Sequence, residues 1–354
     1  MEEKTKSRKI NLCSSPEVKK EDENVDDEGK FDHLPQVKTQ HGIVLAKYKG
    51  FWFNSNLFQS LMSLHKHFEA KDTDIFLATF PKSGTTWLKA LVHTIINRPP
   101  SPLPENHSGE EIIQSPLLFS NPHQLVPFLE NIRFEGGENY YSDDVNRIQI
   151  GSRIFSSHMP YQCLPDSILQ SNSKIIYLYR NPMDVFASTF AFVLENGFAK
   201  LTSVEEEFQL FSNGNQSYGP FWDHILGYWN QSLKAHETDK KRVLFLRYED
   251  LKKDPNPGLK KMAEFLGFPF SVKEEESGMI ERIANLCSFE NLKNLEVNRK
   301  GETETLRFKV KNSSFFRKGE VGDWKNYLTP SMAESFEKLM EEKFAGSGFA
   351  MEMH

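Results

Sequence analysis

Cysteines are scarce in this sequence, and it contains no long apolar run. Its three cysteines, Cys13, Cys163 and Cys287, lie far apart without metal-ligand spacing, which predicts a reducing compartment and no disulfide framework. No apolar run approaches the roughly 18 residues that a membrane span requires. The first ten residues also lack the apolar segment of a signal peptide. We therefore expect a cytoplasmic protein that does not enter a membrane.

Positive charge is not in excess either. The chain has 43 Lys and Arg residues against 49 Asp and Glu residues, which gives a net charge of −6. A general attraction to nucleic acid or to an acidic membrane surface is therefore not expected. A local basic site is still compatible with this composition.

The length and apolar content of the chain suffice for one large domain. It has 354 residues, of which 38% are hydrophobic, and such a chain can bury a sizeable core. Residues 1–40 are the exception, because they are polar, include an acidic stretch and have too few apolar groups to offset ordering entropy. We predict a disordered acidic tail over 1–40 and a single domain over 41–354.

Apolar runs and helical patterns alternate along this domain. Four short runs without polar alternation predict buried parallel strands, namely Ile75–Phe80, Arg153–Ser157, Lys174–Tyr179 and Val243–Leu246. An apolar stripe from Leu88 to Ile96 predicts a helix after the first run. Asn181 and Pro182 are typical of a helix start, and Gly267 of a helix end. The pattern predicts an α/β domain with a central, mainly parallel sheet flanked by helices.

Polar residues follow each of the four predicted strands. Lys82 lies in the loop after the first strand, His158 follows the second, Arg180 ends the third and Tyr248 follows the fourth. Open α/β sheets bind ligands outside the carboxyl ends of their strands. We therefore expect these side chains to meet at one edge of the sheet.

The loop Pro81–Trp87, with the sequence PKSGTTW, has the chemistry of an anion site. Gly84 allows a tight turn, the backbone amides at the helix start favour an anion, and Thr85 and Thr86 add hydroxyl donors. It is not a Walker A loop, because Lys82 precedes the glycine. From the loop alone, sulfuryl transfer, a nucleotide kinase and a plain strand–helix turn all remain open.

With the neighbouring motifs, the chain resembles the cytosolic sulfotransferase family. The segments that carry the resemblance follow PKSGTTW in the family's order, and they are IFSSHMP, YLYRNPMDVFAS, FLRYEDLKKDP, CSFENLK and FFRKGEVGDWKNYL. The stretch SNPHQLVPFLE and the polar N-terminal segment resemble the plant branch of the family. Members of that branch sulfate flavonols, hydroxyjasmonate, steroids and desulfoglucosinolates.

The resemblance implies that the donor is 3′-phosphoadenosine 5′-phosphosulfate (PAPS), that the product is 3′-phosphoadenosine 5′-phosphate (PAP), and that no metal is required. It implies a P-loop-like 5′-phosphosulfate loop. His158 would be the general base, and Lys82 would neutralise charge on the leaving oxygen. The residues implied to bind the donor are Lys82, Ser83, Gly84, Thr85, Thr86 and Trp87, then Arg180, Ser188, Arg317, Lys318 and Gly319 at the 3′-phosphate, and Tyr248, Cys287, Ser288 and Phe289 along the nucleotide.

Two positions depart from the family pattern. Many animal members carry a lysine two residues before the histidine, where this chain has Ser156. Pro330 falls in a segment that resembles a short dimer motif and removes a backbone donor, so we expect a monomer or a weak homodimer. The partner is a small hydroxylated acceptor of unknown identity, and we expect its pocket to involve Tyr161, Phe192, Phe198 and residues 118–145.

Two other functions compete with this interpretation. A metal-dependent nucleotide kinase would need Mg²⁺ and a Walker lysine, and the sequence lacks that lysine. A non-catalytic PAP-binding or hormone-binding protein would keep the anion loop but would not need His158.

Overall fold

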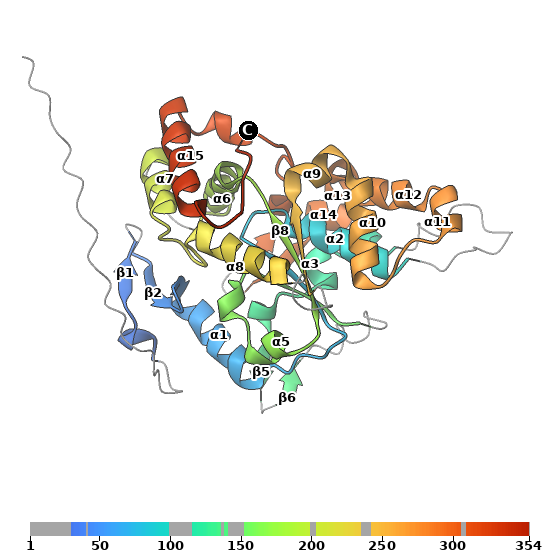
Figure 1. Cartoon of the computed structure of the whole chain (residues 1–354), viewed down its shortest axis with the longest axis horizontal. Helices are drawn as coiled ribbons and strands as arrows, with labels where there is room; N and C mark the ends of the chain where they lie inside the picture. The colour runs from blue at the N-terminus through green and yellow to red at the C-terminus, as the bar shows by residue number, and fades with distance from the viewer. Residues whose placement is uncertain are drawn as a thin grey trace, which may run out of the picture.

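A four-stranded parallel sheet forms the centre of the protein (Figure 1). The computed structural model describes residues 30–39, 42–98, 115–135, 138–140, 152–198, 203–234, 242–305 and 309–353. The strand order is β7-β4-β8-β9, and the bounds are β4 (Ile75–Thr79), β7 (Ile154–Ser157), β8 (Lys174–Tyr179) and β9 (Val243–Arg247). Each predicted strand lies within one residue of these bounds, which confirms the predicted α/β fold class.

The strands are in a register that brings their carboxyl ends to one edge. Ile75 of β4 lies opposite Ile154 of β7 and Lys174 of β8, so these three strands begin at the same level. Every residue of β4 and β7 is buried, which explains why the runs lack polar alternation. The loops after the strands therefore lie next to one another.

Helices cover both faces of the sheet and form two cores. Alternate residues of β4 supply them: Phe76 and Ala78 face one core, and Ile75 and Leu77 face the other. In Figure 1 the two groups of helices lie on opposite sides of the sheet.

The first group of helices is α1 (Ser55–His67), α5 (Asp166–Gln170), α6 (Pro182–Asn196), α7 (Val204–Ser212), α8 (Phe221–Leu233) and α15 (Pro330–Phe344). The second is α2 (Thr85–Ile96), α9 (Tyr248–Lys253), α10 (Pro255–Leu266), α12 (Met279–Leu286) and α13 (Phe289–Asn294). Shorter helices are α3 (Pro122–Leu125), α11 (Val272–Glu276) and α14 (Glu296–Lys300).

The predicted helix ends are confirmed. The Asn181 side chain accepts hydrogen bonds from the backbone N–H groups of Met183 and Asp184, and Pro182 is the first residue of α6. Gly267 ends α10 in the left-handed conformation, with φ of 88°. Of the described residues, no helix combines the length and apolar character needed to cross a membrane.

Smaller antiparallel sheets surround the central one. The first has the order β1-β2-β3, with bounds β1 (Gln36–Lys38), β2 (Val44–Tyr48) and β3 (Phe51–Asn54). The other two are hairpins, formed by β5 (Arg133–Glu135) with β6 (Glu138–Tyr140), and by β10 (Glu302–Glu304) with β11 (Lys309–Lys311).

The boundary predicted for the disordered tail is too late in the chain. Residues 36–38 form β1 and pair with β2, although we expected disorder up to residue 40. Residues 36–38 are ordered because they pair with β2, which comes later in the sequence. The composition of the first 40 residues cannot predict that pairing. The rest of the predicted tail, residues 1–29 and 40, lies outside the described residues.

Candidate active site

A cavity of about 500 Å³ lies at the carboxyl ends of the four parallel strands. The expected meeting of the four strand ends is confirmed, because Lys82, His158, Arg180 and Tyr248 all line this cavity. The predicted site residues that line it are Lys82, Gly84, Thr85, Thr86, Trp87, His158, Arg180, Ser188, Tyr248, Phe289, Arg317, Lys318 and Gly319.

Three of the predicted donor-binding residues do not line the cavity. Ser83 belongs to the anion loop but is fully buried. Cys287 is buried in the second core with its Sγ 3.5 Å from Thr94 Oγ1, and burial raises the pKa of its thiol to about 12. Ser288 uses its hydroxyl to cap α13 by accepting from the N–H of Asn291. The side chains of Cys287 and Ser288 therefore serve the local fold.

Close packing fixes the loop that carries Lys82. Gly84 has φ of 104°, and a Cβ at this position would lie 2.7 Å from Cδ2 of Tyr248, so no larger residue fits. Lys82 also has a left-handed backbone, with φ of 66°. Its Nζ lies 3.7 Å from the centre of the Phe192 ring. Burial, with the nearby charges of Arg317 and Arg180, lowers the pKa of Lys82 to about 7.

His158 follows β7 and presents one ring nitrogen to the cavity. Its Nδ1 lies 2.8 Å from the carbonyl oxygen of Thr79, which only accepts hydrogen bonds, so Nδ1 carries the proton. Nε2 has no hydrogen-bond partner among the described residues, and its lone pair is available. Burial, aided by the charges of Lys89, His224 and Lys82, lowers the pKa of His158 to about 3. The ring is therefore neutral near pH 7.

Glu130 holds the backbone at His158. It lies in a 3-10 helix, Leu129–Asn131, and its Oε1 accepts from the backbone N–H of His158 and from the Ser157 hydroxyl. Burial raises the pKa of Glu130 against the effect of these hydrogen bonds. The carboxyl group thus fixes the end of β7, from which the imidazole extends.

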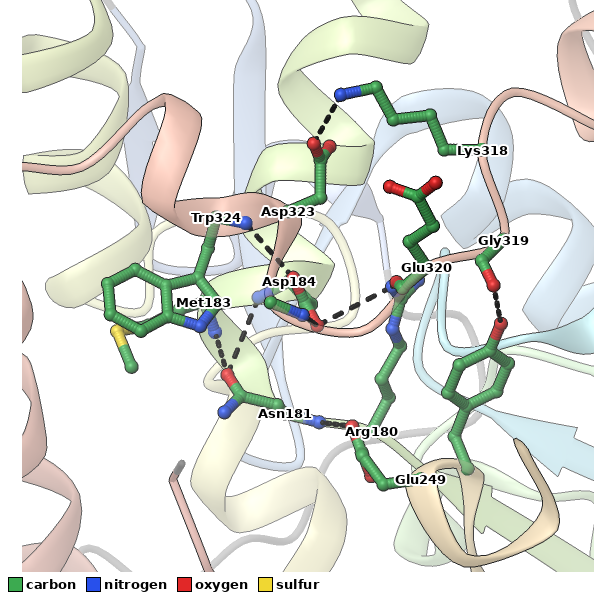
Figure 2. A network of polar contacts seen from close by, with 12 residues as sticks. Arg180, Asn181, Met183, Asp184, Glu249, Lys318, Gly319, Glu320, Asp323 and Trp324 are labelled. Atoms are coloured by element: carbon green, nitrogen blue, oxygen red, sulfur yellow. Dashed lines mark hydrogen bonds and ion pairs between the residues drawn. The ribbon is translucent and has the colours of Figure 1, made fainter. Parts of the chain in front are cut away.

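Another part of the cavity wall is built around Arg180, whose Nη1 lies 3.5 Å from the carbonyl oxygen of Lys82. Its Nη2 donates to the carbonyl oxygen of Glu320 at 2.6 Å, and its guanidinium carbon lies 4.6 Å from the centre of the Tyr248 ring. Tyr248 in turn donates to the carbonyl oxygen of Gly319 at 3.4 Å. Figure 2 shows Arg180, Gly319 and Glu320 close together. Arg180 therefore joins the end of β8 to the loop 317–324.

Asp184 of α6 anchors that same loop. Its two carboxylate oxygens accept from the backbone N–H groups of Gly322 and Trp324, at 2.8 and 3.1 Å, and one lies 3.6 Å from Arg180 (Figure 2). Asp323 of the loop binds Arg317 and Lys318. Burial alone would raise the Asp323 pKa, but the hydrogen bonds from Lys318 and Arg317 outweigh it and lower this pKa to about 2.

The start of α6 also contacts the C-terminal segment. The backbone N–H of Asn181 donates to Glu249, and its side-chain amide donates to the carbonyl oxygen of Met353 at 2.7 Å. Arg247 donates to the Glu352 backbone. Residues 352 and 353 thus form hydrogen bonds with residues next to Arg180 and Tyr248, at the ends of β8 and β9.

Sequence reasoning missed a buried polar chain next to the anion loop. Thr86 Oγ1 lies 2.9 Å from Nε2 of His123, and Nδ1 of His123 lies 2.8 Å from Nζ of Lys89. His123 lines the cavity and Lys89 lies behind it, fully buried. The sequence placed Lys89 within an apolar helix stripe but gave no sign of its partner, which lies 34 residues away.

Some of the residues that we expected around the acceptor line this cavity. Phe192 and Phe198 line the cavity, whereas Tyr161 does not. From the segment 118–145, the cavity is lined by His123, Pro127, Phe128, Glu130 and Asn131. Residues 136, 137 and 141–145 of that segment lie outside the described residues.

Three residues that line the cavity have buried donors without partners. The buried Nε atoms of Arg180 and Arg317 and the indole N–H of Trp87 have no hydrogen-bond partner among the described residues. Buried donors without partners are costly, so a site that contains several is built for a ligand with acceptor atoms. Phosphate and sulfate oxygens are such acceptors, and arginine binds them well.

The family of the chain follows from comparison with known proteins. Residues 72–348 match the sulfotransferase domain family. Cytosolic sulfotransferase 5 of Arabidopsis thaliana is 40% identical over 93% of this chain and 97% of its own length. A flavonol sulfotransferase-like protein of Flaveria bidentis is 41% identical over 88% of this chain and 94% of its own length. A mouse sulfotransferase solved in complex with PAP has a TM-score of 0.62 and is 29% identical, over 86% of this chain and 95% of that one.

The names of these relatives agree with the location expected from the sequence, since several are cytosolic sulfotransferases. The matched family covers the anion loop, His158, Arg180 and the loop 317–324, which are the parts that form the cavity. The chain therefore belongs to the sulfotransferase family and is a sulfotransferase enzyme, as its sequence motifs indicated.

Proposed function

We propose that this enzyme transfers a sulfuryl group from PAPS to a hydroxyl group of a small-molecule acceptor, with His158 as the general base. The observation that carries the proposal is the position of His158. Its Nδ1 is committed to the Thr79 carbonyl, and its Nε2 faces the cavity near Lys82. A neutral imidazole with one free lone pair is the group that accepts a proton from a hydroxyl.

The reaction exchanges one bond to sulfur for another. The acceptor oxygen forms a bond to sulfur while the bond from sulfur to the 5′-phosphate oxygen breaks. The hydroxyl proton moves to Nε2 of His158, and the charge on the departing phosphate oxygen develops beside Lys82. Positioning and charge stabilisation are the main work of the protein in a transfer of this kind.

Burial is the main cause of the low pKa of His158. Lys82 and Lys89 contribute to that low pKa, because positive charge disfavours an imidazolium. Negative charge placed between these groups offsets their effect and raises the His158 pKa. A base whose pKa approaches the working pH transfers protons efficiently.

Recognition of the donor depends on its two separated anionic groups. Lys82, Thr85, Thr86 and the amides near Gly84 would hold the 5′-phosphosulfate at one end. Arg180, Ser188 and Arg317 would hold the 3′-phosphate at the other end. The PAP bound to the mouse relative fits this assignment. ATP lacks a 3′-phosphate and leaves the second group of residues unused.

The acceptor pocket is aromatic on the His158 side. Phe128 and Tyr218 lie 4.9 and 5.7 Å from the His158 ring, and Phe192 and Phe198 pack together beyond Lys82. Such walls suit a flat or ring-containing alcohol or phenol. Flavonols, hydroxyjasmonates, steroids and desulfoglucosinolates are the acceptor classes that we propose for testing.

Two measurements test the proposal. Transfer of labelled sulfate from PAPS to the four acceptor classes tests the reaction, and we expect turnover with at least one class and without added Mg²⁺. Thermal melting with PAP and with ATP tests the donor. A ligand at 100 times its Kd stabilises a protein by about 2.7 kcal/mol, so PAP should raise the Tm clearly and ATP much less. Equal shifts from both nucleotides would contradict the assignment of Arg180 and Arg317.

A further inference from the structure

Thr86, Lys89 and His123 form a short hydrogen-bonded chain beside the anion loop. Thr86 and Lys89 lie three residues apart on one face of α2, and His123 comes from α3. Nε2 of His123 lies 2.9 Å from Thr86 Oγ1, and its Nδ1 lies 2.8 Å from Lys89 Nζ. Both ring nitrogens are thus occupied, in contrast to those of His158.

Lys89 is a buried amine with few polar partners. Its side chain is fully buried, which lowers the pKa of Lys89 well below its usual value, and the charge of Glu130 offsets part of this shift. Its Nζ contacts only the His123 nitrogen and the Phe128 ring, whose centre is 3.5 Å away. Leu88 and Leu91 show that this helix accepts apolar residues at buried positions. A buried amine is costly, and a buried ionisable group with a shifted pKa beside a cavity is a candidate functional residue.

The donors and acceptors of the chain fix the direction of its hydrogen bonds. Burial lowers the pKa of Lys89 and the charge of Glu130 raises it. In its ammonium form Lys89 only donates hydrogen bonds, and in that form it is the donor to Nδ1 of His123. Burial and the neighbouring Lys89 lower the pKa of His123, so the ring is neutral and has one proton. That proton therefore sits on Nε2 and is donated to Thr86 Oγ1. Thr86 Oγ1, which has no second partner among the described residues, keeps its own proton for the cavity that Thr86 lines.

We propose that Lys89 and His123 are positioning residues that hold the Thr86 hydroxyl as a donor to the 5′-phosphate end of the nucleotide. The inference rests on the proposed function, because it assigns that end of PAPS to the anion loop. Thr85 is different, since its hydroxyl lies 2.7 Å from the Thr79 hydroxyl and either oxygen is able to donate. At Thr86 the hydrogen bonds from Lys89 to His123 and from His123 to Thr86 determine which atom donates.

The test compares two nucleotides that differ only at the 5′ end. Binding of PAP and of adenosine 3′-monophosphate is measured by calorimetry for the wild type, His123→Leu and His123→Gln. A hydrogen bond to a charged group accounts for about tenfold in affinity. We expect His123→Leu to lose about tenfold in PAP affinity and to keep its affinity for adenosine 3′-monophosphate. His123→Gln places an amide N–H near Thr86 and should stay within about threefold of the wild type for PAP.

A double-mutant cycle separates positioning from a general structural effect. On a Thr86→Val background, His123→Leu should cause almost no additional loss of PAP affinity. His93→Leu is the matched control, because His93 is a buried histidine on the same helix whose two ring nitrogens have no partner among the described residues. It should leave both affinities unchanged.

The possible outcomes are distinct. Equal loss for both nucleotides, or additive losses in the cycle, would overturn the role of His123. Failure of the wild type to bind PAP would overturn the proposed function instead. Should His123→Leu not fold, Lys89→Met with and without Thr86→Val carries the same test, with an expected PAP-specific loss that disappears in the double variant.

Discussion

Two groups of side chains that line the cavity, one at the anion loop and one around Arg180, differ in their chemistry. At the anion loop, hydroxyls, a lysine and two histidines surround the space, and the pKa values of Lys82 and His158 are lowered to about 7 and about 3. In the other group, Arg180 and Arg317 are held by the buried carboxylates of Asp184 and Asp323. Guanidinium groups keep their charge at any working pH.

This difference follows from what each group has to do. In the proposed reaction a proton moves and charge shifts between oxygens at the anion loop, so groups that change protonation or hydrogen-bond direction are useful there. In the same proposal, the residues around Arg180 only hold a 3′-phosphate that does not react. A charge of fixed value and position, set by internal ion pairs, suits that task. Variants of the two groups should therefore fail in different measurements.

The largest effect is expected for His158→Ala. Loss of a general base costs roughly 10²–10⁴-fold in rate, so kcat should fall at least about 100-fold on one acceptor. PAP affinity should change by less than about 1 kcal/mol, because the phosphates are held by other residues. Turnover is measured by transfer of labelled sulfate and affinity by calorimetry, with His93→Leu as a buried histidine control. A variant that keeps a tenth of wild-type kcat would show that His158 is not the base.

The second-largest effect is expected for Arg180→Met, and here PAP affinity rather than kcat should change. Arg180→Met should weaken PAP binding by about 30-fold, because a bidentate guanidinium–phosphate contact is lost. Adenosine 5′-phosphosulfate, which lacks the 3′-phosphate, should bind the variant as it binds the wild type. Arg98→Met is the control, since Arg98 is half-buried, binds Glu274 and does not line the cavity. Equal losses for both nucleotides would place Arg180 elsewhere in the site.

Lys82 allows a test that uses pH alone. With its pKa near 7, Lys82 loses its charge as pH rises, whereas the 5′-phosphate of bound PAP keeps it protonated. PAP affinity should therefore fall between pH 7.5 and 9, by at most about tenfold per pH unit. Lys82→Arg should flatten the profile, because arginine stays charged. An unchanged slope in Lys82→Arg would assign the pH dependence to another group.

The smallest effect is expected for Asp184→Asn. The amide keeps one acceptor oxygen, but it places an N–H₂ group against a backbone donor or against Arg180. Loss of one such buried contact costs about 2–3 kcal/mol of stability and about fivefold in PAP affinity. Urea unfolding and calorimetry measure the two, while kcat at saturating donor should stay near the wild-type value. A large fall in kcat would mean that the two groups are coupled.

The sequence predicted those features that depend on local pattern. Continuous apolar runs located the four strands, and Asn181 and Gly267 marked helix ends, because capping and burial leave a signal in adjacent residues. The convergence of Lys82, His158, Arg180 and Tyr248 also followed, since the ends of parallel strands share one edge.

Contacts between distant segments were not predictable in this way. His123 meets Lys89 only because α3 packs against α2, and no spacing in the sequence reports that. Cys287 and Ser288 belong to a motif whose side chains turn to the core and to a helix cap, away from the cavity. For the same reason β1 was missed, since its order comes from pairing with β2.

The bond between Asn181 and the Met353 carbonyl has a practical consequence for handling the protein. Residues 352 and 353 hydrogen-bond to the segments that follow or end the strands carrying Arg180 and Tyr248. We therefore expect a purification tag fused directly after residue 354 to disturb the start of α6 and to change measured nucleotide affinities. A cleavable tag placed before residue 30 avoids this interference.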